Sequence, residues 1–245
     1  MDFRGKTALV TGAAVGIGRA AAVRLAEGGA NLLLMDMNGE KLEKVKRELE
    51  KYPVQVLAAV CDVSDEAQVN EAIRAGEAEL GGIDILINNA ALWRCWKPFL
   101  ETDSGEWKKF LDVNIMGTVY CTRAVLGGMT KRKYGRIVNI ASVAGVYGNA
   151  NMVHYSATKG AVIAMTKALA KEVAAQGVTV NSISPGSVSP SENDDMDYSQ
   201  PSELSFMGRT GTDRENAELI CFIASEEAGY ISGQNIQIDG CRKKQ

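Results

Sequence analysis

The chain has 245 residues, of which 46% are hydrophobic and 23% charged, the balance of an ordinary globular domain. The net charge of −3, without a long basic run, argues against a dedicated nucleic-acid binder or a protein that docks on anionic membranes. Five widely spaced cysteines and one histidine predict neither a disulfide framework nor a metal site. Without a signal-like N-terminus or an apolar run of about 18 residues, we expect a cytoplasmic protein.

The first strand and helix enclose a glycine-rich turn. Residues 7–10 are apolar and predict a strand, residues 19–27 are alanine-rich and favour a helix, and TGAAVGIG (11–18) lies between them. Strand, glycine-rich turn and helix form the context of a dinucleotide fingerprint, in which Gly12, Gly16 and Gly18 would let the backbone approach a pyrophosphate. A plain turn between strand and helix is the alternative interpretation.

The second strand, residues 30–36, ends in Asp36, which lies 18 positions after Gly18. A carboxylate near this distance accepts hydrogen bonds from the adenosine ribose hydroxyls and repels a 2′-phosphate. Val15 and Met37, where a phosphate-binding arginine could have stood, are apolar. The pattern favours NAD over NADP, although Asp36 could instead cap the turn that follows the strand.

The middle of the chain continues the alternation. We expect helices at 41–51, at 104–132 and from Ser64 or Asp65 to residue 80, and strands at 54–61 and 83–87. NNAA (88–91) follows the fourth strand, at the strand end where α/β proteins bind ligands. Asn114 stands in the middle of the long helix, where asparagine is unfavourable, and therefore marks a kink or a functional site.

The second half predicts strands at 136–141, 178–184 and 235–239, with helices at 155–176 and from Thr212 or Asp213 to residue 224. Residues 145–153 are a polar link, 187–207 a polar, proline-broken loop, and 242–245 a loose tail. Strands and helices alternate throughout, which predicts the α/β class: one doubly wound parallel sheet of about seven strands with helices on both faces. We expect a single domain over residues 1–245, with the loop at 187–207 as a substrate-binding loop.

The segment YSATK (155–159) places Tyr155 and Lys159 four residues apart. In a helix both side chains share one face, with Cβ atoms about 5–6 Å apart. A cation beside a phenol favours the phenolate and lowers its pKa, which suits the phenol to act as a general acid or base toward an alcohol oxygen. Many helices carry such a pair by chance, so the surrounding motifs must support this interpretation.

Those motifs resemble the short-chain dehydrogenase/reductase family across residues 5–240. The resemblance lies in TGAAVGIG (11–18), Asp62-Val63, NNAA (88–91), Asn114, Ser142, YSATK (155–159), Pro185-Gly186, GRTG (208–211) and SGQNIQIDG (232–240). It implies a Rossmann-type fold, NAD or NADP as cofactor, alcohol–carbonyl chemistry on a small-molecule alcohol or ketone, and a homodimer or homotetramer.

The resemblance also implies roles. Tyr155 would be the acid and base, Lys159 would bind the nicotinamide ribose and lower the pKa of Tyr155, Ser142 would hold the substrate oxygen, and Asn114 would hold a water that relays protons. Cofactor contacts would come from Gly12, Gly16, Ile17, Gly18, Asp36, Asp62, Val63, Asn89, Tyr155, Lys159, Pro185, Gly186 and Val188.

The chain departs from the family pattern at three positions. Ala91 and Cys241 stand where glycine is usual, and Pro190 stands where a threonine often contacts the cofactor. Ser189 or Ser191 would then supply that contact.

Candidate residues of the substrate pocket are Trp93, Cys95, Trp96, Val143, Tyr147, Met152, His154, and Met196 or Tyr198. The tryptophans could form a flat apolar wall for a ring-shaped substrate such as a hydroxysteroid or an alicyclic alcohol, or could pack under the loop or at a subunit contact. For His154, a surface position at the helix start competes with a chemical role. The acids Glu192, Asp194, Asp195 and Asp197 could disfavour anionic substrates or simply be solvated.

The sequence thus predicts an NAD-dependent oxidoreductase that acts on a secondary alcohol or ketone. An NADP-dependent carbonyl or 3-oxoacyl reductase is the alternative, and Asp36 speaks against it. A dinucleotide-binding scaffold or redox sensor without turnover is an alternative of another class, against which stands the complete set of Asn114, Ser142, Tyr155 and Lys159.

Overall fold

The computed structural model describes residues 1–94, 96–189 and 195–243. Within them, seven parallel strands form one sheet in the order β3-β2-β1-β4-β5-β6-β7. The strands are β1 (Thr7–Thr11), β2 (Asn31–Asp36), β3 (Val56–Val60), β4 (Ile85–Asn88), β5 (Gly135–Ile140), β6 (Val178–Pro185) and β7 (Asn235–Ile238). The predicted α/β class and the parallel sheet are confirmed.

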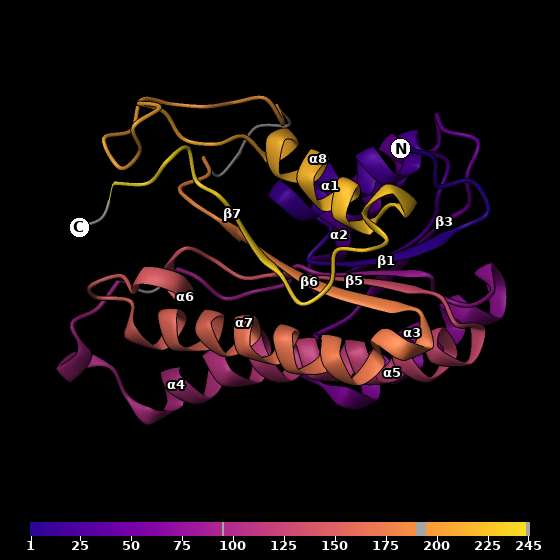
Figure 1. The fold of residues 1–245 in the computed structure, drawn as a ribbon, viewed down its shortest axis with the longest axis horizontal. Coiled ribbons are helices and arrows are strands. Elements are labelled where there is room, and N and C mark those ends of the chain that lie inside the picture. Colours follow the sequence, from indigo (N-terminus) through magenta and orange to yellow (C-terminus); the bar gives the residue numbers. More distant parts are fainter. Residues whose placement is uncertain (95, 190–194, 244–245) are drawn as a thin grey trace.

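Helices cover both faces of the sheet (Figure 1). One layer holds α1 (Gly16–Glu27), α2 (Gly39–Leu49) and α8 (Asp213–Ala224). The other layer holds α3 (Glu66–Leu80), α4 (Ser104–Leu111), α5 (Gly117–Arg132) and α7 (Val153–Val173), and the short α6 (Ala144–Tyr147) follows β5.

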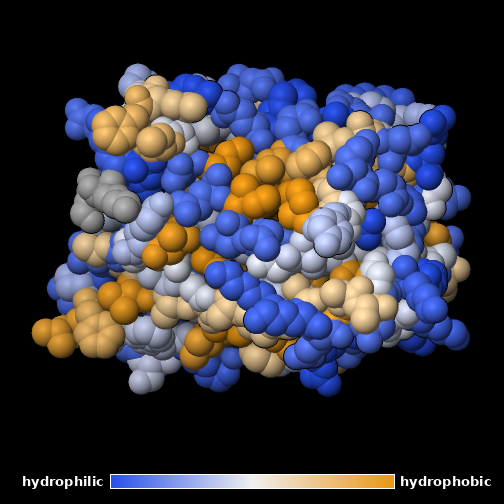
Figure 2. All heavy atoms as spheres, in the orientation of Figure 1, coloured by the Kyte–Doolittle hydropathy of each residue, from blue (hydrophilic) through white to orange (hydrophobic). Residues whose placement is uncertain are grey.

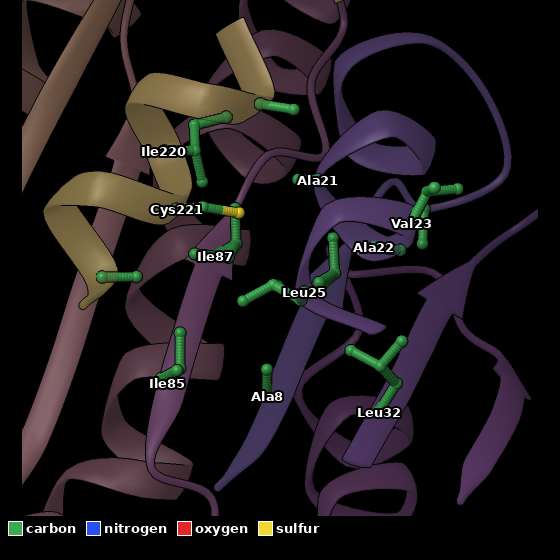
Figure 3. Close-up of a cluster of buried hydrophobic side chains, with 14 of the residues drawn as sticks. Ala8, Ala21, Ala22, Val23, Leu25, Leu32, Ile85, Ile87, Ile220 and Cys221 are labelled. Atoms are coloured by element: carbon green, nitrogen blue, oxygen red, sulfur yellow. The ribbon is translucent and has the colours of Figure 1, made fainter. Parts of the chain in front are cut away.

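Each layer encloses its own apolar core. Figure 3 shows part of the first core, where Ala21 and Leu25 of α1 pack with Ile87 on the sheet and Ile220 on α8. The second core joins α3, α5 and α7 to the other face through residues such as Ile73, Val125 and Val173. Burial on both faces explains why the central strands are nearly continuous apolar runs.

The strand order places a crevice at the carboxyl ends of β1 and β4. These two strands are neighbours, while β2 and β3 extend to one side and β5 to β7 extend to the other. At such a reversal the connections leave toward opposite faces of the sheet, and ligands of open α/β sheets bind there. The Thr11 hydroxyl holds the crevice together by accepting hydrogen bonds from the backbone N–H groups of Asn89 (3.0 Å) and Ala90 (3.1 Å).

Three segments differ from the sequence prediction. The helix expected over 104–132 is divided, because residues 112–116 form a π-helical turn between α4 and α5. The polar link at 145–153 overlaps α6. Arg242 is not in a loose tail, since the N–H of Lys243 donates to Leu204 O (3.0 Å) and the N–H of Phe206 donates to Cys241 O (2.9 Å).

Exposed apolar side chains gather on the segment between β4 and α4. Trp93, Trp96, Phe99 and Leu100 are all exposed there, and Leu100 is almost completely so. Figure 2 shows hydrophobic residues at the lower left, where Figure 1 places this segment. A search of the described helices finds none with the length and apolarity needed to cross a bilayer.

Candidate active site

A cleft of about 1920 Å³ runs along the carboxyl ends of the strands. It collects most of the residues that the sequence singles out: Gly12, Gly16, Ile17, Asp36, Asp62, Val63, Asn89, Trp93, Trp96, Ser142, Val143, Tyr147, Tyr155, Lys159, Pro185, Gly186 and Val188. Gly18, Asn114 and His154 lie outside its wall. Pro190, Ser191, Cys95, Glu192 and Asp194 fall outside the described residues.

The glycine-rich turn is as tight as its sequence predicts. Gly12 has φ +63°, and a Cβ there would lie 2.9 Å from the Ala90 Cα. A Cβ on Gly18 would lie 2.1 Å from the Gly12 carbonyl oxygen. Only glycine fits either place, so Gly18 supports the turn from behind rather than lining the cleft.

The N-terminus of α1 opens into this cleft without a side-chain cap. Val15 occupies the N-cap position and makes no capping hydrogen bond, and Gly16 and Ile17 line the cleft. The first N–H groups of a helix lack intrahelical partners and carry a positive partial charge. The turn therefore fits a pyrophosphate, as in a dinucleotide cofactor.

Asp36 lines the cleft at the end of β2 and also caps the next turn. Its carboxylate accepts hydrogen bonds from the N–H of Ala14 (3.1 Å) and the N–H of Asn38 (2.9 Å). Val15 and Met37 beside it are exposed. Arg19, a cation of the same wall, is paired with Glu48 at 2.8 Å. Capping of the turn and binding of a ribose are compatible roles for Asp36, because a carboxylate can accept more than the two hydrogen bonds seen here.

Lys159 is buried beside Tyr155 on α7. Its ammonium donates to the Ile140 carbonyl (2.7 Å) and lies 5.8 Å from the centroid of the Tyr155 ring. Burial lowers the pKa of Lys159 to about 8. Burial also raises the pKa of Tyr155, and a hydrogen bond with Ser142 only partly opposes this rise. The expected lowering of the Tyr155 pKa by Lys159 is therefore not seen in this structure, since burial dominates and the ammonium bonds a carbonyl.

Ser142 reaches Tyr155 because α6 packs tightly on α7. A Cβ on Gly145 would lie 2.5 Å from the carbonyl carbon of Lys159, so glycine permits this close approach. The Ser142 hydroxyl accepts a hydrogen bond from the Ala144 N–H (3.1 Å), which fixes its position at the end of β5. The hydroxyls of Ser142 and Tyr155 thus face the same part of the cleft.

Asn114 lies behind the cleft, in the π-helical turn. Its amide oxygen accepts from the Leu92 N–H (2.8 Å), and its amide nitrogen donates to Leu92 O (3.0 Å) and to the Thr158 hydroxyl (3.0 Å). The side chain thereby ties the segment after β4 to the helix that carries Tyr155. Asn114 does mark a distortion of the helix, as its unfavourable position predicts.

Aromatic side chains line the other end of the cleft. Trp93 and Trp96 are 47% and 70% exposed, so neither is packed under the loop. Val143 and Met152 are buried and also line the cleft, and the Tyr147 hydroxyl bonds Gln237. The tryptophans therefore present open apolar surface at the mouth of the cleft.

His154 is completely buried, and neither of its ring nitrogens has a hydrogen-bond partner among the described residues. Its ring packs on Phe110, with centroids 4.0 Å apart, and on Trp107. The expected surface position and the place in the substrate pocket are both wrong, because the first turn of α7 directs this side chain into the space between α4 and α7.

Two expectations for the loop at 187–207 are also corrected. Met196 packs against the first core, and Tyr198 is exposed outside the cleft wall. Asp197 pairs with Arg214 (2.9 Å), and neither it nor Asp195 lines the cleft. Ser189 and Leu204 do line it, and the Ser189 hydroxyl bonds that of Thr210 (2.6 Å).

Sequence reasoning missed several residues of the cleft wall, among them Arg94, Asn149, Leu204 and Arg242. Arg242 is the most informative of them, because its guanidinium reaches Asn149 across the mouth of the cleft. No periodicity or motif marks a residue at position 242, so only the fold reveals it.

Comparison with known proteins identifies related chains. The family model described as short chain dehydrogenase matches residues 6–200. A 3-oxoacyl-[acyl-carrier-protein] reductase of Thermotoga maritima is 36% identical over 98% of both chains. A 2-dehydro-3-deoxy-L-rhamnonate dehydrogenase (NAD(+)) of Sphingomonas sp. is 39% identical, over 98% of this chain and 96% of the relative. The structure of an NAD+-bound xylitol dehydrogenase superimposes with a TM-score of 0.90 at 34% identity, covering 98% of this chain and all of the other.

Proposed function

The chain belongs to the short-chain dehydrogenase family, and we propose that it is an NAD(H)-dependent oxidoreductase that interconverts a secondary alcohol and a ketone of a small molecule. The observation that carries the proposal is the position of the Tyr155 hydroxyl. It faces the Ser142 side chain, lies beside buried Lys159, and occupies the same cleft as the uncapped N-terminus of α1.

The bound nicotinamide would accept the hydride in oxidation and supply it in reduction. Tyr155 Oη would take the hydroxyl proton of the substrate in oxidation and return it in reduction. Ser142 Oγ would donate a hydrogen bond to the substrate oxygen. Lys159 would hydrogen-bond the nicotinamide ribose in place of the Ile140 carbonyl, and its charge would then favour the phenolate of Tyr155.

Asp36 supports NAD as the cofactor. Its carboxylate would accept hydrogen bonds from the ribose hydroxyls and would repel a 2′-phosphate. The names of the Sphingomonas relative and of the xylitol dehydrogenase structure both include NAD, which supports the same choice. Residues 187–189 and Leu204 on the cleft wall support a substrate-binding role for the loop at 187–207.

The test is turnover, followed at the absorbance band of reduced nicotinamide, with NAD and then with NADP. The panel holds polyols, hydroxy acids, alicyclic alcohols, hydroxysteroids and 3-oxoacyl thioesters. We expect turnover with NAD, and a loss of kcat of at least 100-fold in Tyr155→Phe, the scale of general acid–base catalysis. Near-normal kcat in Tyr155→Phe would refute the assignment, and NAD binding without turnover of any substrate would favour a scaffold or redox sensor.

An NADP-dependent 3-oxoacyl reductase is the second candidate. The observation that favours it is the similarity to the Thermotoga 3-oxoacyl-[acyl-carrier-protein] reductase along nearly the full length of both chains. Faster reduction of acetoacetyl-CoA with NADPH than with NADH would select this candidate. None of the relatives reported above is named for a steroid, so these comparisons favour a hydroxysteroid substrate less than an acyl or sugar-like one.

We also propose that the protein is a homodimer or homotetramer. The exposed apolar residues beside α4, among them Phe99 and Leu100, support association of subunits. Light scattering coupled to gel filtration would measure the mass, and a monomer at micromolar concentration would refute the proposal.

A further inference from the structure

Charge is divided unevenly along the cleft. The end formed by α2 and by the carboxyl ends of β2 and β3 carries charges of both signs, the acids Asp36, Glu48 and Asp62 and the cations Arg19, Lys41 and Lys44. The other end consists of the aromatic wall and the link at 148–152. None of its described residues is acidic, and both Arg94 and Arg242 line this end. The end of the cleft near Tyr155 therefore has a positive character.

Arg242 is held in place by its backbone. Its N–H donates to the Asp239 carboxylate (3.3 Å), and it forms a bridge with Ser205. The next residue, Lys243, is bonded to Leu204 O. Residues 241–243 are thus bonded to the loop at 187–207. This contact fixes the backbone of the half-buried Arg242 at the mouth of the cleft.

The guanidinium points toward the catalytic helix through Asn149. Its Nη2 donates to the Asn149 amide oxygen (3.2 Å), and the Asn149 N–H donates to the Ser156 hydroxyl (3.1 Å). Ser156 directly follows Tyr155. Arg242 is therefore separated from the residue beside the catalytic tyrosine by one asparagine.

Asn149 orients this charge without neutralising it. Within the described part of the chain, no carboxylate lies within 4.0 Å of the Arg242 guanidinium, although Asp239 contacts its backbone. A guanidinium has five N–H donors in a planar fork that matches a carboxylate. Asn149 uses one of them, and the remaining donors are available to an anion in the cleft.

We propose that Arg242 binds a carboxylate of the substrate and so selects hydroxy or oxo acids over neutral alcohols. This inference rests on the proposed function, because it assumes that the substrate occupies the end of the cleft near Tyr155. It stands against the expectation that the acidic loop disfavours anions, of whose two described acids, Asp195 and Asp197, neither lines the cleft.

The test uses substrates that differ only in the anion. D-gluconate is compared with D-glucitol, and 3-hydroxybutyrate with its methyl ester, all with NAD and the full-length enzyme. In Arg242→Gln we expect kcat/KM for the acids to fall about 10- to 100-fold, mainly through KM, the scale of a hydrogen bond to a charged group. The neutral partners should change less than twofold, and Arg242→Lys should lie between the two enzymes.

Lys243→Gln is the matched control, because it removes the adjacent positive charge, which packs over the Phe206 ring and does not line the cleft. It should leave both members of each pair unchanged. An equal fall for acid and neutral partner in Arg242→Gln, or no fall, overturns the inference while the proposed function stands.

The anion that Arg242 binds could be a carboxylate of the substrate or a phosphate of coenzyme A, and a pair of thioesters distinguishes the two. If Arg242→Gln impairs acetoacetyl-CoA but not acetoacetyl-N-acetylcysteamine, and spares the acids, the bound group is a phosphate and the carboxylate assignment is wrong.

Absence of turnover on every substrate would refute the proposed function, and binding then decides the inference. Gluconate and glucitol are titrated into the NAD-loaded enzyme while tryptophan fluorescence is followed. A signal for gluconate that disappears in Arg242→Gln supports the inference, and equal signals in both enzymes overturn it.

Discussion

His154 is a buried polar side chain whose ring nitrogens have no hydrogen-bond partner in the described part of the chain. Burial lowers its pKa, and nearby Lys97 adds to this effect while Glu106 opposes it. Replacing it with an apolar group of similar size removes unsatisfied nitrogens that cost about 1–3 kcal/mol. We expect His154→Leu to raise the free energy of unfolding by about 1 kcal/mol at pH 7.5, measured in urea.

The same variant has a distinct pH dependence. The unfolded histidine takes up a proton below its ordinary pKa of 6.5, whereas the folded one takes it up only at lower pH. Wild-type stability therefore falls as the pH decreases through this window, and the variant should lack that part of the fall. Identical slopes between pH 7.5 and pH 5.5 in the two proteins would contradict the burial argument.

Burial of the Lys159 ammonium destabilises the folded protein. Its pKa falls from 10.5 to about 8 on burial, a difference that corresponds to a cost of up to about 3 kcal/mol at neutral pH. The Lys159→Met variant also loses the hydrogen bond to Ile140 O, which reduces its gain in stability by about 1 kcal/mol. We expect Lys159→Met to be inactive, yet more stable than wild type in urea at pH 7 by about 1–2 kcal/mol.

The gain from Lys159→Met should shrink as the pH rises from 8 to 10. The folded lysine releases its proton in this range while the unfolded one keeps it, so wild-type stability increases relative to the variant. The raised pKa of Tyr155 lowers the stability of the folded protein as the pH rises, but only above pH 10, the ordinary pKa of a tyrosine. A stability difference that is constant between pH 7 and pH 9.5 would contradict the assigned lysine pKa.

At the scale of elements, local sequence patterns were sufficient for most helices and strands. Asp65 and Thr212 cap α3 and α8, as their positions before the periodic segments predict. In the sequence, only Asn114 indicated the division of the helix at 104–132. A π-helical turn depends on contacts distant in sequence, here those of Asn114 with Leu92 and Thr158, which periodicity does not reveal.

The turn between β1 and α1 should tolerate no added methyl group. In Gly18→Ala the new Cβ would lie 2.1 Å from Gly12 O and 2.5 Å from the Asn89 amide nitrogen, so the turn must open. We expect a loss of about 2–3 kcal/mol of stability and no measurable NAD binding. Gly127→Ala on α5 is the control, because nothing lies within 4 Å of its Cβ and alanine stabilises a helix by about 1 kcal/mol. Normal NAD affinity in Gly18→Ala would contradict the tight turn.

At the scale of the whole molecule, the positions of Ser142 and Tyr155 in the cleft could be predicted, and those of Arg242 and His154 could not. Ser142 and Tyr155 lie at fixed places relative to strand ends and helix starts, which the order of elements determines. The positions of Arg242 and His154 depend on how a loop and a helix pair pack across many residues. Those contacts are specific to this chain, which is why the sequence suggested that Arg242 is in a loose tail and that His154 is at the surface, whereas the structure shows Arg242 bonded to Asn149 and His154 buried.

Cofactor choice can be measured as a property of the whole fold. A ligand at 100 times its Kd stabilises the folded state by about 2.7 kcal/mol, which raises the Tm of a chain of this size by roughly 5–10 °C. We expect NAD to produce this shift and NADP to produce less than half of it, because the Asp36 carboxylate repels the 2′-phosphate.

Asp36→Asn separates that repulsion from the structural role of the residue. The amide oxygen can still accept a hydrogen bond from Ala14 or Asn38, so the turn is retained while the negative charge is lost. The NADP shift should then rise toward the NAD shift. Asp112→Asn, which removes a carboxylate of the cleft wall that pairs with Lys108, should leave both shifts as in wild type. A larger shift with NADP than with NAD in the wild-type protein would mean that cations of the same cleft wall, such as Arg19, Lys41 and Lys44, and not the Asp36 carboxylate, determine which cofactor binds more tightly.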